Sequence, residues 1–274
     1  MYRFSMRSLI VWLLASLSIA FHGAALADME KIRASGKLSF AVYEDFAPFS
    51  SKAGGVDVDL AEALAKRLGL QASFIPFPAG ENIDDDLRNM VWKGHYLGIG
   101  PADVMMHVPV DRAVIQKNDK VEIFAPYYRD TIRLARSLNS IPDLNGSESL
   151  KGKRLGAEKV SISAMVLLGD ASLRDNVQIF LTPAEALQKL KAGELDAVVA
   201  TRSEIESVIR DDKNIEITEA PFERLPRKGW VTGMAVTKEN TELANLLQAA
   251  INELFESGEM AALFAKHGVR SVKP

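Results

Sequence analysis

Short apolar runs alternate with helical periodicity along this chain, and that alternation limits the possible folds more than any other feature. Lys37–Val42, Ala72–Phe77 and Asp103–Val108 are short and apolar, which is typical of strands. Between them, residues 57–68 carry leucine at every fourth position, and the helical stretch Asp84–Lys93 is followed by a glycine. The order strand, helix, strand, helix, strand predicts a parallel sheet covered by helices.

A second α/β unit is predicted beyond the polar stretch Ser137–Ser149, which follows an extended segment over Ile123–Ala135. Capping boxes at Thr182–Glu185 and Ser203–Glu206 indicate the starts of two of its helices. In open α/β sheets, ligands bind beyond the carboxyl ends of the strands, so two such units predict a cleft. The remaining elements are expected as strands at Arg154–Ala157, Val177–Leu181, Leu195–Ala200 and Trp230–Thr237, and as helices from Ala164, at Pro183–Ala192, at Glu204–Arg210 and over 240–268 with a break at Ser257.

The composition describes a globular protein and excludes several chemistries. The chain has 274 residues, 47% of them hydrophobic and 25% charged, so it can bury a core without disulfides or a structural metal. The absence of cysteine excludes thiol nucleophiles, thiolate zinc sites and iron–sulfur clusters. A net charge of −3 with no basic block indicates that nucleic acid is not a partner.

The first 27 residues have the pattern of a secretory signal peptide. Arg3 and Arg7 precede an apolar run, Leu9–Phe21, and Ala25–Ala27 supplies a small–x–small cleavage pattern. The run is shorter than the about 20 residues that span a bilayer, although a retained membrane anchor is the alternative. We therefore expect cleavage after Ala27 and a mature protein that works outside the cytoplasmic membrane, with no membrane-integrated segment.

Seven motifs in order resemble the periplasmic solute-binding proteins of the polar amino-acid type, often called family 3. The resemblance covers essentially the whole chain after the signal peptide. The motifs are GKLSFAVYEDFAPFS (Gly36–Ser50), GGVDVDLAEALAKRLGL (Gly54–Leu70), ADVMMHVPVDR (Ala102–Arg112), FAPYYRD (Phe124–Asp130), LKGKRLGAEKVS (Leu150–Ser161), EALQKLKAGELDAVV (Glu185–Val199) and GMAVTKENTELANLLQAAINELFESG (Gly233–Gly258).

The resemblance implies a two-lobe α/β fold of the type II periplasmic-binding-protein kind, each lobe a mostly parallel sheet flanked by helices. Residues 28–127 and 230–274 would form lobe one, residues 128–229 lobe two, and two crossing segments would form a hinge. It also implies a monomeric periplasmic protein that captures a small ligand between its lobes and presents it to the permease of an ABC-type transporter. Such a protein is not an enzyme, and no cofactor is expected.

A narrower resemblance gives an alternative function. The segment Asp84–Arg112, followed by APYYRD, is similar to the branch of the family associated with quinoprotein alcohol dehydrogenases. That branch implies an accessory protein, outside transport, that binds a PQQ-dependent alcohol or methanol dehydrogenase and assists its maturation or activity. Trp92, His95 and Tyr96 would then contact the partner, line the mouth of the cleft, or only cover lobe one.

Two arginines decide the expected charge of the ligand. Arg112 matches the family arginine that pairs with the ligand's carboxylate. The residues just before it depart from the family pattern, and Asp111 could neutralise its charge. The alternative is that Arg112 forms only a structural ion pair. Thr201 stands where amino-acid binders have an aspartate for the ligand's ammonium group, so an ordinary amino acid is not the expected ligand. If Arg112 and Arg202 both face the cleft, the ligand is anionic or carboxylate-bearing; otherwise Arg202 is solvated on a helix.

The resemblance places further ligand-binding residues in both lobes, each with a structural alternative. Ser161 and Ser163 lie at a predicted helix N-terminus, where hydroxyl and N–H groups bind anions or cap the helix. Phe46 and Phe49 would contact the ligand or anchor their loop.

The sequence leaves the roles of four more side chains open. Met105 and Met106 would form a soft cleft wall, or at least one of them belongs to the core. Tyr127 and Tyr128 fall at the predicted hinge, where one would pack and the other, Tyr128, would reach the cleft.

The sequence offers no constellation for catalysis or metal binding. His95, His107 and His267 are far apart and lack the spacing of a zinc site. The carboxylates at 84–86 open a helix, where acids stabilise the helix dipole. There is no GxSxG, P-loop or dinucleotide-binding glycine pattern.

Overall fold

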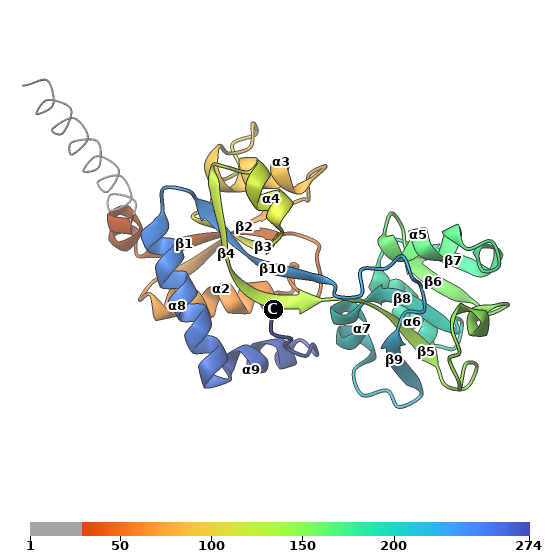
Figure 1. Ribbon diagram of the computed structural model, residues 1–274. Helices are drawn as coiled ribbons and strands as arrows, with labels where there is room; N and C mark the ends of the chain where they lie inside the picture. The colour runs from red at the N-terminus through yellow and green to blue at the C-terminus, as the bar shows by residue number, and fades with distance from the viewer. Residues whose placement is uncertain (1–28) are drawn as a thin grey trace, which may run out of the picture. The chain divides into compact units, whose positions relative to one another are not determined.

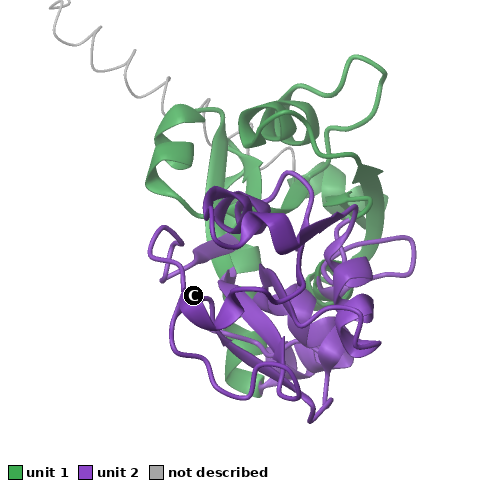
Figure 2. Cartoon of the chain, turned by 90° about the vertical axis from the view of Figure 1, so that its right-hand side faces the viewer, with its two compact units in different colours: residues 1–45, 57–126, 233–257 green, residues 46–56, 127–232, 258–274 purple. Residues whose placement is uncertain are grey.

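The computed structural model describes residues 29–274, in two compact units (Figures 1 and 2). Unit 1 comprises residues 29–45, 57–126 and 233–257, and unit 2 comprises residues 46–56, 127–232 and 258–274. The predicted signal peptide and its cleavage after Ala27 lie outside the described residues. In the part of the chain from residue 29 on, no helix is both long enough and apolar enough to cross a membrane.

Unit 1 is built on a five-stranded sheet in the order β2-β1-β3-β10-β4. The central strand β1 pairs in parallel with β2 and with β3, as the alternation of strands and helices predicts. Its elements are β1 (Lys37–Tyr43), α2 (Val56–Arg67), β2 (Gln71–Phe77), α3 (Ile83–Leu87), a π-helical turn (Arg88–Trp92), β3 (Val104–Pro109), α4 (Arg112–Lys117), β4 (Val121–Asp130), β10 (Trp230–Thr237) and α8 (Thr241–Ser257), of which α2, β4 and β10 also contain unit 2 residues.

Unit 2 is built on a second five-stranded sheet, in the order β7-β6-β8-β5-β9. This sheet is mixed: β6 pairs in parallel with β7 and β8, whereas β5 pairs antiparallel with β8 and β9. Its elements are β5 (Ile132–Ser137), β6 (Leu155–Glu158), α5 (Ile162–Gly169), β7 (Val177–Phe180), α6 (Pro183–Lys191), β8 (Ala197–Thr201), α7 (Arg202–Ile209), β9 (Ile215–Glu219) and α9 (Glu259–Lys266), with short 3-10 turns at Ser147–Leu150 and Arg174–Asn176.

The apolar strand β8 is buried on both faces, which explains its unbroken run of small and branched side chains. Successive strand residues point to opposite faces of a sheet. Ala197 and Val199 join a core cluster that also contains residues of α5, whereas Val198 and Ala200 join a cluster that contains residues of α6 and α7. Helices therefore cover both faces of the sheet, as its parallel strands require.

Parallel pairing brings the ends of β6 and β8 to one edge of the second sheet. Leu155 is paired with Ala197 and Gly156 with Val198, so both strands run in the same direction. Glu158 ends β6 just before α5, and Thr201 ends β8 just before α7. Two helix N-termini consequently start at the same edge of the sheet.

The structure corrects one predicted capping box and adds two elements. The N-cap of α7 is Thr201, whose partner is Glu204; the prediction placed the box at Ser203, whose hydroxyl instead donates to Asp130. The predicted box before α6 begins at Thr182 as expected, where the hydroxyl accepts from the N–H of Glu185 at 3.2 Å. The additional elements are the short helix α4 and the edge strand β9.

Tyr128 packs against two segments that the predicted lobe boundaries assign to the other lobe. Its ring lies 5.4 Å from that of Phe49 and 4.9 Å from that of Phe264, centroid to centroid. Residues 46–56 and 258–274, which contain Phe49 and Phe264, belong to unit 2. The lobe boundaries at 127 and 230 stay a prediction.

Candidate functional site

A cavity of about 140 Å³ lies in unit 2 at the carboxyl ends of β6 and β8. Helix N-termini offer N–H groups and a favourable dipole to a ligand at such a place. Three of the side chains predicted to bind a ligand, those of Ser161, Ser163 and Thr201, come together here with two carboxylic acids. The cavity is lined by Ile132, Glu158, Ser161, Ile162, Ser163, Pro183, Val199, Ala200, Thr201, Glu204 and Trp230.

The start of α5 leaves hydrogen-bonding groups free toward this cavity. Ser161 is the N-cap: its hydroxyl accepts from the N–H of Ala164 at 3.0 Å and donates to the carbonyl of Glu158 at 2.7 Å. Ser163 is only 3% exposed, yet its hydroxyl has no hydrogen-bond partner among residues 29–274. The backbone N–H groups of Ile162 and Ser163 also lack an acceptor in this part of the chain.

At the start of α7, the polar groups are hydrogen-bonded to other groups of the protein. The N–H of Thr201 donates to Oε2 of Glu204 at 2.9 Å, and the N–H of Glu204 donates to Oγ1 of Thr201 at 3.3 Å. Ser203 donates its hydroxyl to the buried carboxylate of Asp130, which also accepts from the N–H of Thr131 at 2.8 Å. Thr201 is therefore a helix cap that also lines the cavity.

Burial raises the pKa of both acids that line the cavity. Desolvation raises the pKa of Glu158, whose side chain has no hydrogen bond or ion pair among the described residues. Desolvation also raises the pKa of Glu204 to about 7; the nearby Glu158 and Asp130 carboxylates raise it further, while bonds from Thr201 oppose the rise. Glu204 is thus close to two other carboxyl groups, and no lysine, arginine or histidine lines the cavity.

Arg202 lies in a cluster with Tyr128 and Glu206 and is absent from the cavity lining. Its Nη2 donates to the hydroxyl of Tyr128 at 3.2 Å, and its Nε lies 3.5 Å from Oε1 of Glu206. Burial is the main reason why the pKa of Tyr128 is raised. The Arg202 side chain is 12% exposed, so the expectation that it is solvated on its helix is not what the structure shows.

The C-terminal segment completes this cluster. Arg270 donates its backbone N–H and its Nε to the two oxygens of Glu206, both at 2.8 Å. Its carbonyl accepts from Arg202 at 3.3 Å. These hydrogen bonds connect α7 to residues 267–274, so the polar groups around Arg202 have a structural role.

The loop aromatics pack in the same unit. Phe46 and Phe49 stack with ring centroids 5.5 Å apart, and Phe49 is buried against Tyr128. Phe46 remains partly exposed. The structure therefore favours loop anchoring for Phe49 and leaves the ligand-contact prediction for Phe46 as a prediction.

In unit 1, Arg112 is exposed at the first position of α4. Asp111 does not pair with it; its carboxylate instead accepts from the N–H groups of Ala113 and Val114, at 2.8 and 3.3 Å. No described residue forms a hydrogen bond or ion pair with the Arg112 guanidinium. Met106 and its neighbour Met105 are fully buried in β3, as expected of core residues.

The residues predicted to contact a partner lie on the surface of unit 1. Trp92 is 41% exposed and Tyr96 is 88% exposed. The rings of His95 and Tyr96 pack at 4.3 Å between centroids. These three side chains share one segment of unit 1 and do not belong to the cavity of unit 2.

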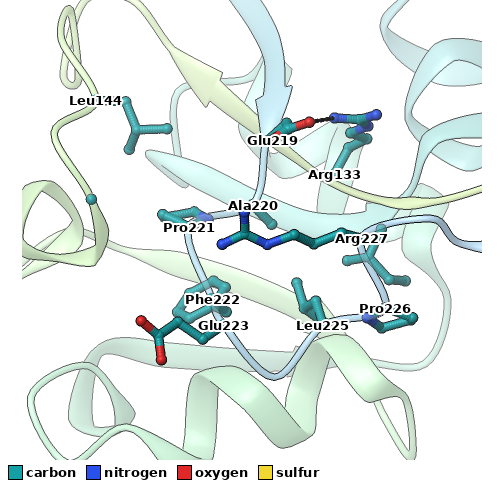
Figure 3. A pocket seen from close by; sticks show the side chains of 12 residues that line it. Arg133, Leu144, Glu219, Ala220, Pro221, Phe222, Glu223, Leu225, Pro226 and Arg227 are labelled. Atoms are coloured by element: carbon teal, nitrogen blue, oxygen red, sulfur yellow. Dashed lines mark ion pairs between the residues drawn. The ribbon is translucent and has the colours of Figure 1, made fainter.

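A larger cavity in unit 2, about 300 Å³ in volume, is a weaker candidate. In Figure 3 the Arg227 side chain extends across it, and Arg133 forms an ion pair with Glu219 at 3.3 Å. It is formed mainly by the segment 219–227 after β9 and contains none of the predicted ligand-binding residues. Within residues 29–274, no group of three or more His, Asp or Glu side chains is arranged to hold a metal ion.

Sequence reasoning missed Glu158, Glu204 and Trp230 as lining residues. Glu158 could have been found, because it directly follows a predicted strand and precedes a predicted helix cap. Glu204 was assigned only to the start of a helix. The position of Trp230 beside β6 and β8 depends on tertiary packing that no local pattern reports.

The solved structures that resemble this chain share one fold, the two-lobe α/β fold of type II periplasmic binding proteins. An ancestral cationic amino acid solute-binding protein is 22% identical, with a TM-score of 0.69, and covers 88% of this chain and 99% of its own. The second substrate-binding domain of GlnP from Lactococcus lactis is 24% identical, with a TM-score of 0.60, and covers 85% of this chain and 95% of its own.

Curated relatives are similar at low identity over most of the chain. The L-cystine-binding protein TcyJ of Escherichia coli K12 is 24% identical over 254 residues, which cover 87% of this chain and 85% of TcyJ. The ABC transporter glutamine-binding protein GlnH of Bacillus subtilis is 22% identical over 247 residues, which cover 89% and 83%. Both are named as binding proteins and not as enzymes.

No family model matches the chain. The relatives agree with the broader resemblance, to amino-acid solute-binding proteins of ABC transporters. They give no support to the branch associated with quinoprotein dehydrogenases, and none to an anionic ligand.

Proposed function

We propose that this protein is a periplasmic solute-binding protein that delivers a small amino-acid-like ligand to an ABC-type permease. The observation that carries the proposal is the cavity at the carboxyl ends of β6 and β8, with a free Ser163 hydroxyl and free N–H groups at the start of α5. Relatives named for cystine and glutamine binding support it. So does the shared fold with amino-acid-binding proteins.

The start of α5 suits the carboxylate of such a ligand. An anion there accepts from the free N–H groups of Ile162 and Ser163 and from the Ser163 hydroxyl, and it lies at the positive end of the helix dipole. The cavity contains no group that resembles a nucleophile with an adjacent base. Capture and release, without bond breaking, is the function that this arrangement supports.

Thermal unfolding with a panel of small solutes tests the proposal. A solute at a hundredfold excess over its dissociation constant stabilises the folded state by ~2.7 kcal/mol. For a chain of this size that corresponds to a rise in Tm of about 5–10 °C. The panel comprises the twenty L-amino acids, L-cystine, dicarboxylic acids and alcohols; a flat Tm across all of them would remove the proposal.

Arg112 is proposed separately as a ligand contact in unit 1, on the strength of its matching motif position and its exposed guanidinium, which has no partner among the described residues. Arg112→Ala is then expected to weaken binding of the ligand about 10- to 100-fold. Because no described residue depends on this side chain, the free energy of unfolding should change by less than about 0.5 kcal/mol. Unchanged affinity would show that Arg112 is only a surface residue.

A dehydrogenase-associated role is a second candidate, favoured only by the exposed Trp92 and Tyr96 in unit 1. Affinity purification of the protein from cells grown on an alcohol tests it. A quinoprotein dehydrogenase that is retained by the native protein and lost from a Trp92→Ser/Tyr96→Ser variant would establish this role. Retention of no dehydrogenase, together with ligand-dependent stabilisation, would leave transport as the function.

A further inference from the structure

We propose that the larger cavity of unit 2 is a second binding site, which takes a small organic carboxylate with an apolar body. The proposal concerns a second ligand and not the transported solute, which belongs to the smaller cavity. None of the residues predicted to bind that solute lines the larger cavity. Three features support the proposal: an apolar floor, an arginine without a partner, and a wall that is held in place.

The floor of the larger cavity is apolar and continuous with the core of unit 2. Ile132 and Leu225 are only 9% and 7% exposed and belong to the core cluster that includes residues of β8. Leu144, Ala220 and Phe222 are partly buried against the same cluster. A volume of about 300 Å³ lies at the lower end of the range for pockets that hold small molecules. The cavity therefore has room for a ring or a short branched chain, which would be removed from water there.

Arg227 is the group that would bind the carboxylate. Its side chain extends across the cavity (Figure 3), and its guanidinium has no hydrogen bond or ion pair with any described residue. A planar guanidinium can bind a carboxylate through two parallel hydrogen bonds. Arg133, the other arginine of the lining, is already engaged: its Nε donates to Oγ1 of Thr131 at 3.1 Å, and its Nη1 lies 3.3 Å from Oε1 of Glu219. Arg227 is thus the cation that remains available to a ligand.

The two acids of the lining leave Arg227 without a counter-ion. Glu219 pairs with Arg133, and its side chain is 81% exposed. Glu223 is also exposed and forms no ion pair with any residue from 29 to 274. Because solvent screens the charge of an exposed group, Glu223 opposes an anion at Arg227 only weakly. Neutralising Glu223 should accordingly strengthen the binding of a carboxylate.

The wall formed by residues 219–227 is held in place at both ends. At one end the segment continues from β9, which pairs with β5. Near the other end, Gly229 has a φ of +63°, and a Cβ there would overlap the carbonyl oxygen of Asp130. Between these ends, Pro221 and Pro226 restrict the backbone. The wall is therefore pre-organised, which reduces the conformational entropy that a ligand must offset on binding.

Calorimetric titration of the protein with 3-phenylpropionate tests the assignment. Two matched probes separate the contributions: 3-phenylpropionamide keeps the ring without the charge, and acetate keeps the charge without the ring. Wild type should bind the acid about 5- to 10-fold more tightly than the amide, because only the acid pairs with Arg227. Acetate should bind at least about 10-fold more weakly than 3-phenylpropionate, because it does not cover the apolar floor.

Three variants assign the charge dependence to Arg227. Arg227→Ala should weaken the binding of 3-phenylpropionate about 5- to 10-fold and leave that of the amide unchanged. Arg224→Ala is the matched control, because it removes the same charge from an exposed position of the same segment that is outside the lining. It should bind both probes as wild type does. Glu223→Gln should strengthen the binding of the acid about twofold.

If Arg227→Ala does not fold, Arg227→Lys provides the measurement instead. Lysine keeps the charge but lacks the planar fork of the guanidinium, so the loss of affinity should be intermediate. Equal binding of 3-phenylpropionate by wild type and the Arg227 variants would overturn the inference, and so would no binding of this acid at millimolar concentration.

The position of the bound acid is measured separately, because Ile132 lines both cavities of unit 2. Amide NMR spectra recorded with 3-phenylpropionate should change mainly at residues 144–146 and 219–227. Changes mainly at residues 158–163 and 201–204, with affinity reduced by Ser163→Ala and not by Arg227→Ala, would place the acid in the smaller cavity. That outcome also overturns the inference, whereas the proposed transport function is decided by the solute panel alone.

Discussion

The helices α5 and α7 start at the same edge of the second sheet, but they differ in whether the polar groups at their N-termini are already hydrogen-bonded. At α7, the Thr201–Glu204 capping box and the bond from Ser203 to Asp130 satisfy the local donors and acceptors. At α5, Ser161 caps the helix while the Ser163 hydroxyl and the Glu158 carboxylate have no partner among the described residues. The comparison teaches that helix capping and ligand binding can be told apart by asking which groups are already bonded.

Removing the buried acid behind α7 should have the largest effect on stability. Asp130 is 3% exposed and accepts from Ser203 and Thr131, so Asp130→Ala leaves buried donors without an acceptor. We expect a loss of about 3 kcal/mol in the free energy of unfolding, measured by urea denaturation. Exposed Asp211 supplies the control, since Asp211→Ala should cost less than about 0.5 kcal/mol. Equal effects of the two substitutions would mean that the α7 start is not a closed network.

The acid of the capping box should make stability depend on pH. Burial raises the pKa of Glu204 to about 7 in the folded state, above its ordinary value of 4.5. Between those two values the folded protein therefore binds more protons than the unfolded chain, and the contribution of this group to stability falls as the pH rises. From pH 4.5 to 7 the loss should be on the order of 1–3 kcal/mol.

Glu204→Gln isolates this contribution, because the amide keeps an oxygen acceptor for Thr201 but does not titrate in this range. The free energy of unfolding of wild type, relative to that of Glu204→Gln, should fall as the pH rises from about 4.5 to 7 and stay constant outside that range. Parallel pH profiles for the two proteins would contradict the raised pKa.

The smallest expected effects come from the hydroxyl groups of Thr201 and Ser163, at the two helix starts. Thr201→Ala removes the cap of α7 and should cost about 1 kcal/mol of stability.

Ser163→Ala removes a hydroxyl with no partner among the described residues, so stability should change by less than about 0.5 kcal/mol while affinity for the ligand falls about 2- to 10-fold. Urea denaturation and calorimetry of both variants check this. A larger loss of stability from Ser163→Ala than from Thr201→Ala would reverse our assignment of the two helix starts.

Local periodicity was enough to predict most elements, as β10 at Trp230–Thr237 illustrates by matching its predicted bounds. The two added elements were missed because their signals are weak. Helix α4 has six residues, none of them buried, so it lacks an apolar face. Strand β9 has two charged residues among five and lies at the edge of its sheet.

The candidate site was only partly predictable, because the sequence contains two overlapping capping patterns. Thr201 and Ser203 each precede a glutamate at the third following position. Long-range contacts decide between them: Asp130 bonds Ser203, and Arg270 bonds Glu206. Arg202 also donates to distant partners, the hydroxyl of Tyr128 and the carbonyl of Arg270, and its predicted ligand contact stays a prediction. No local pattern could have placed these distant partners.

The small volume of the unit 2 cavity limits what this part of the molecule can discriminate. About 140 Å³ is roughly the space that four or five water molecules occupy in the liquid, which is room for a head group and little more. The residues that line a cavity of this size contact the head group of a solute, and they do not contact the rest of a longer solute. Substitution of Ser163 should therefore affect every solute that shares the same head group, whereas preference among such solutes must be encoded by other residues and could be changed separately.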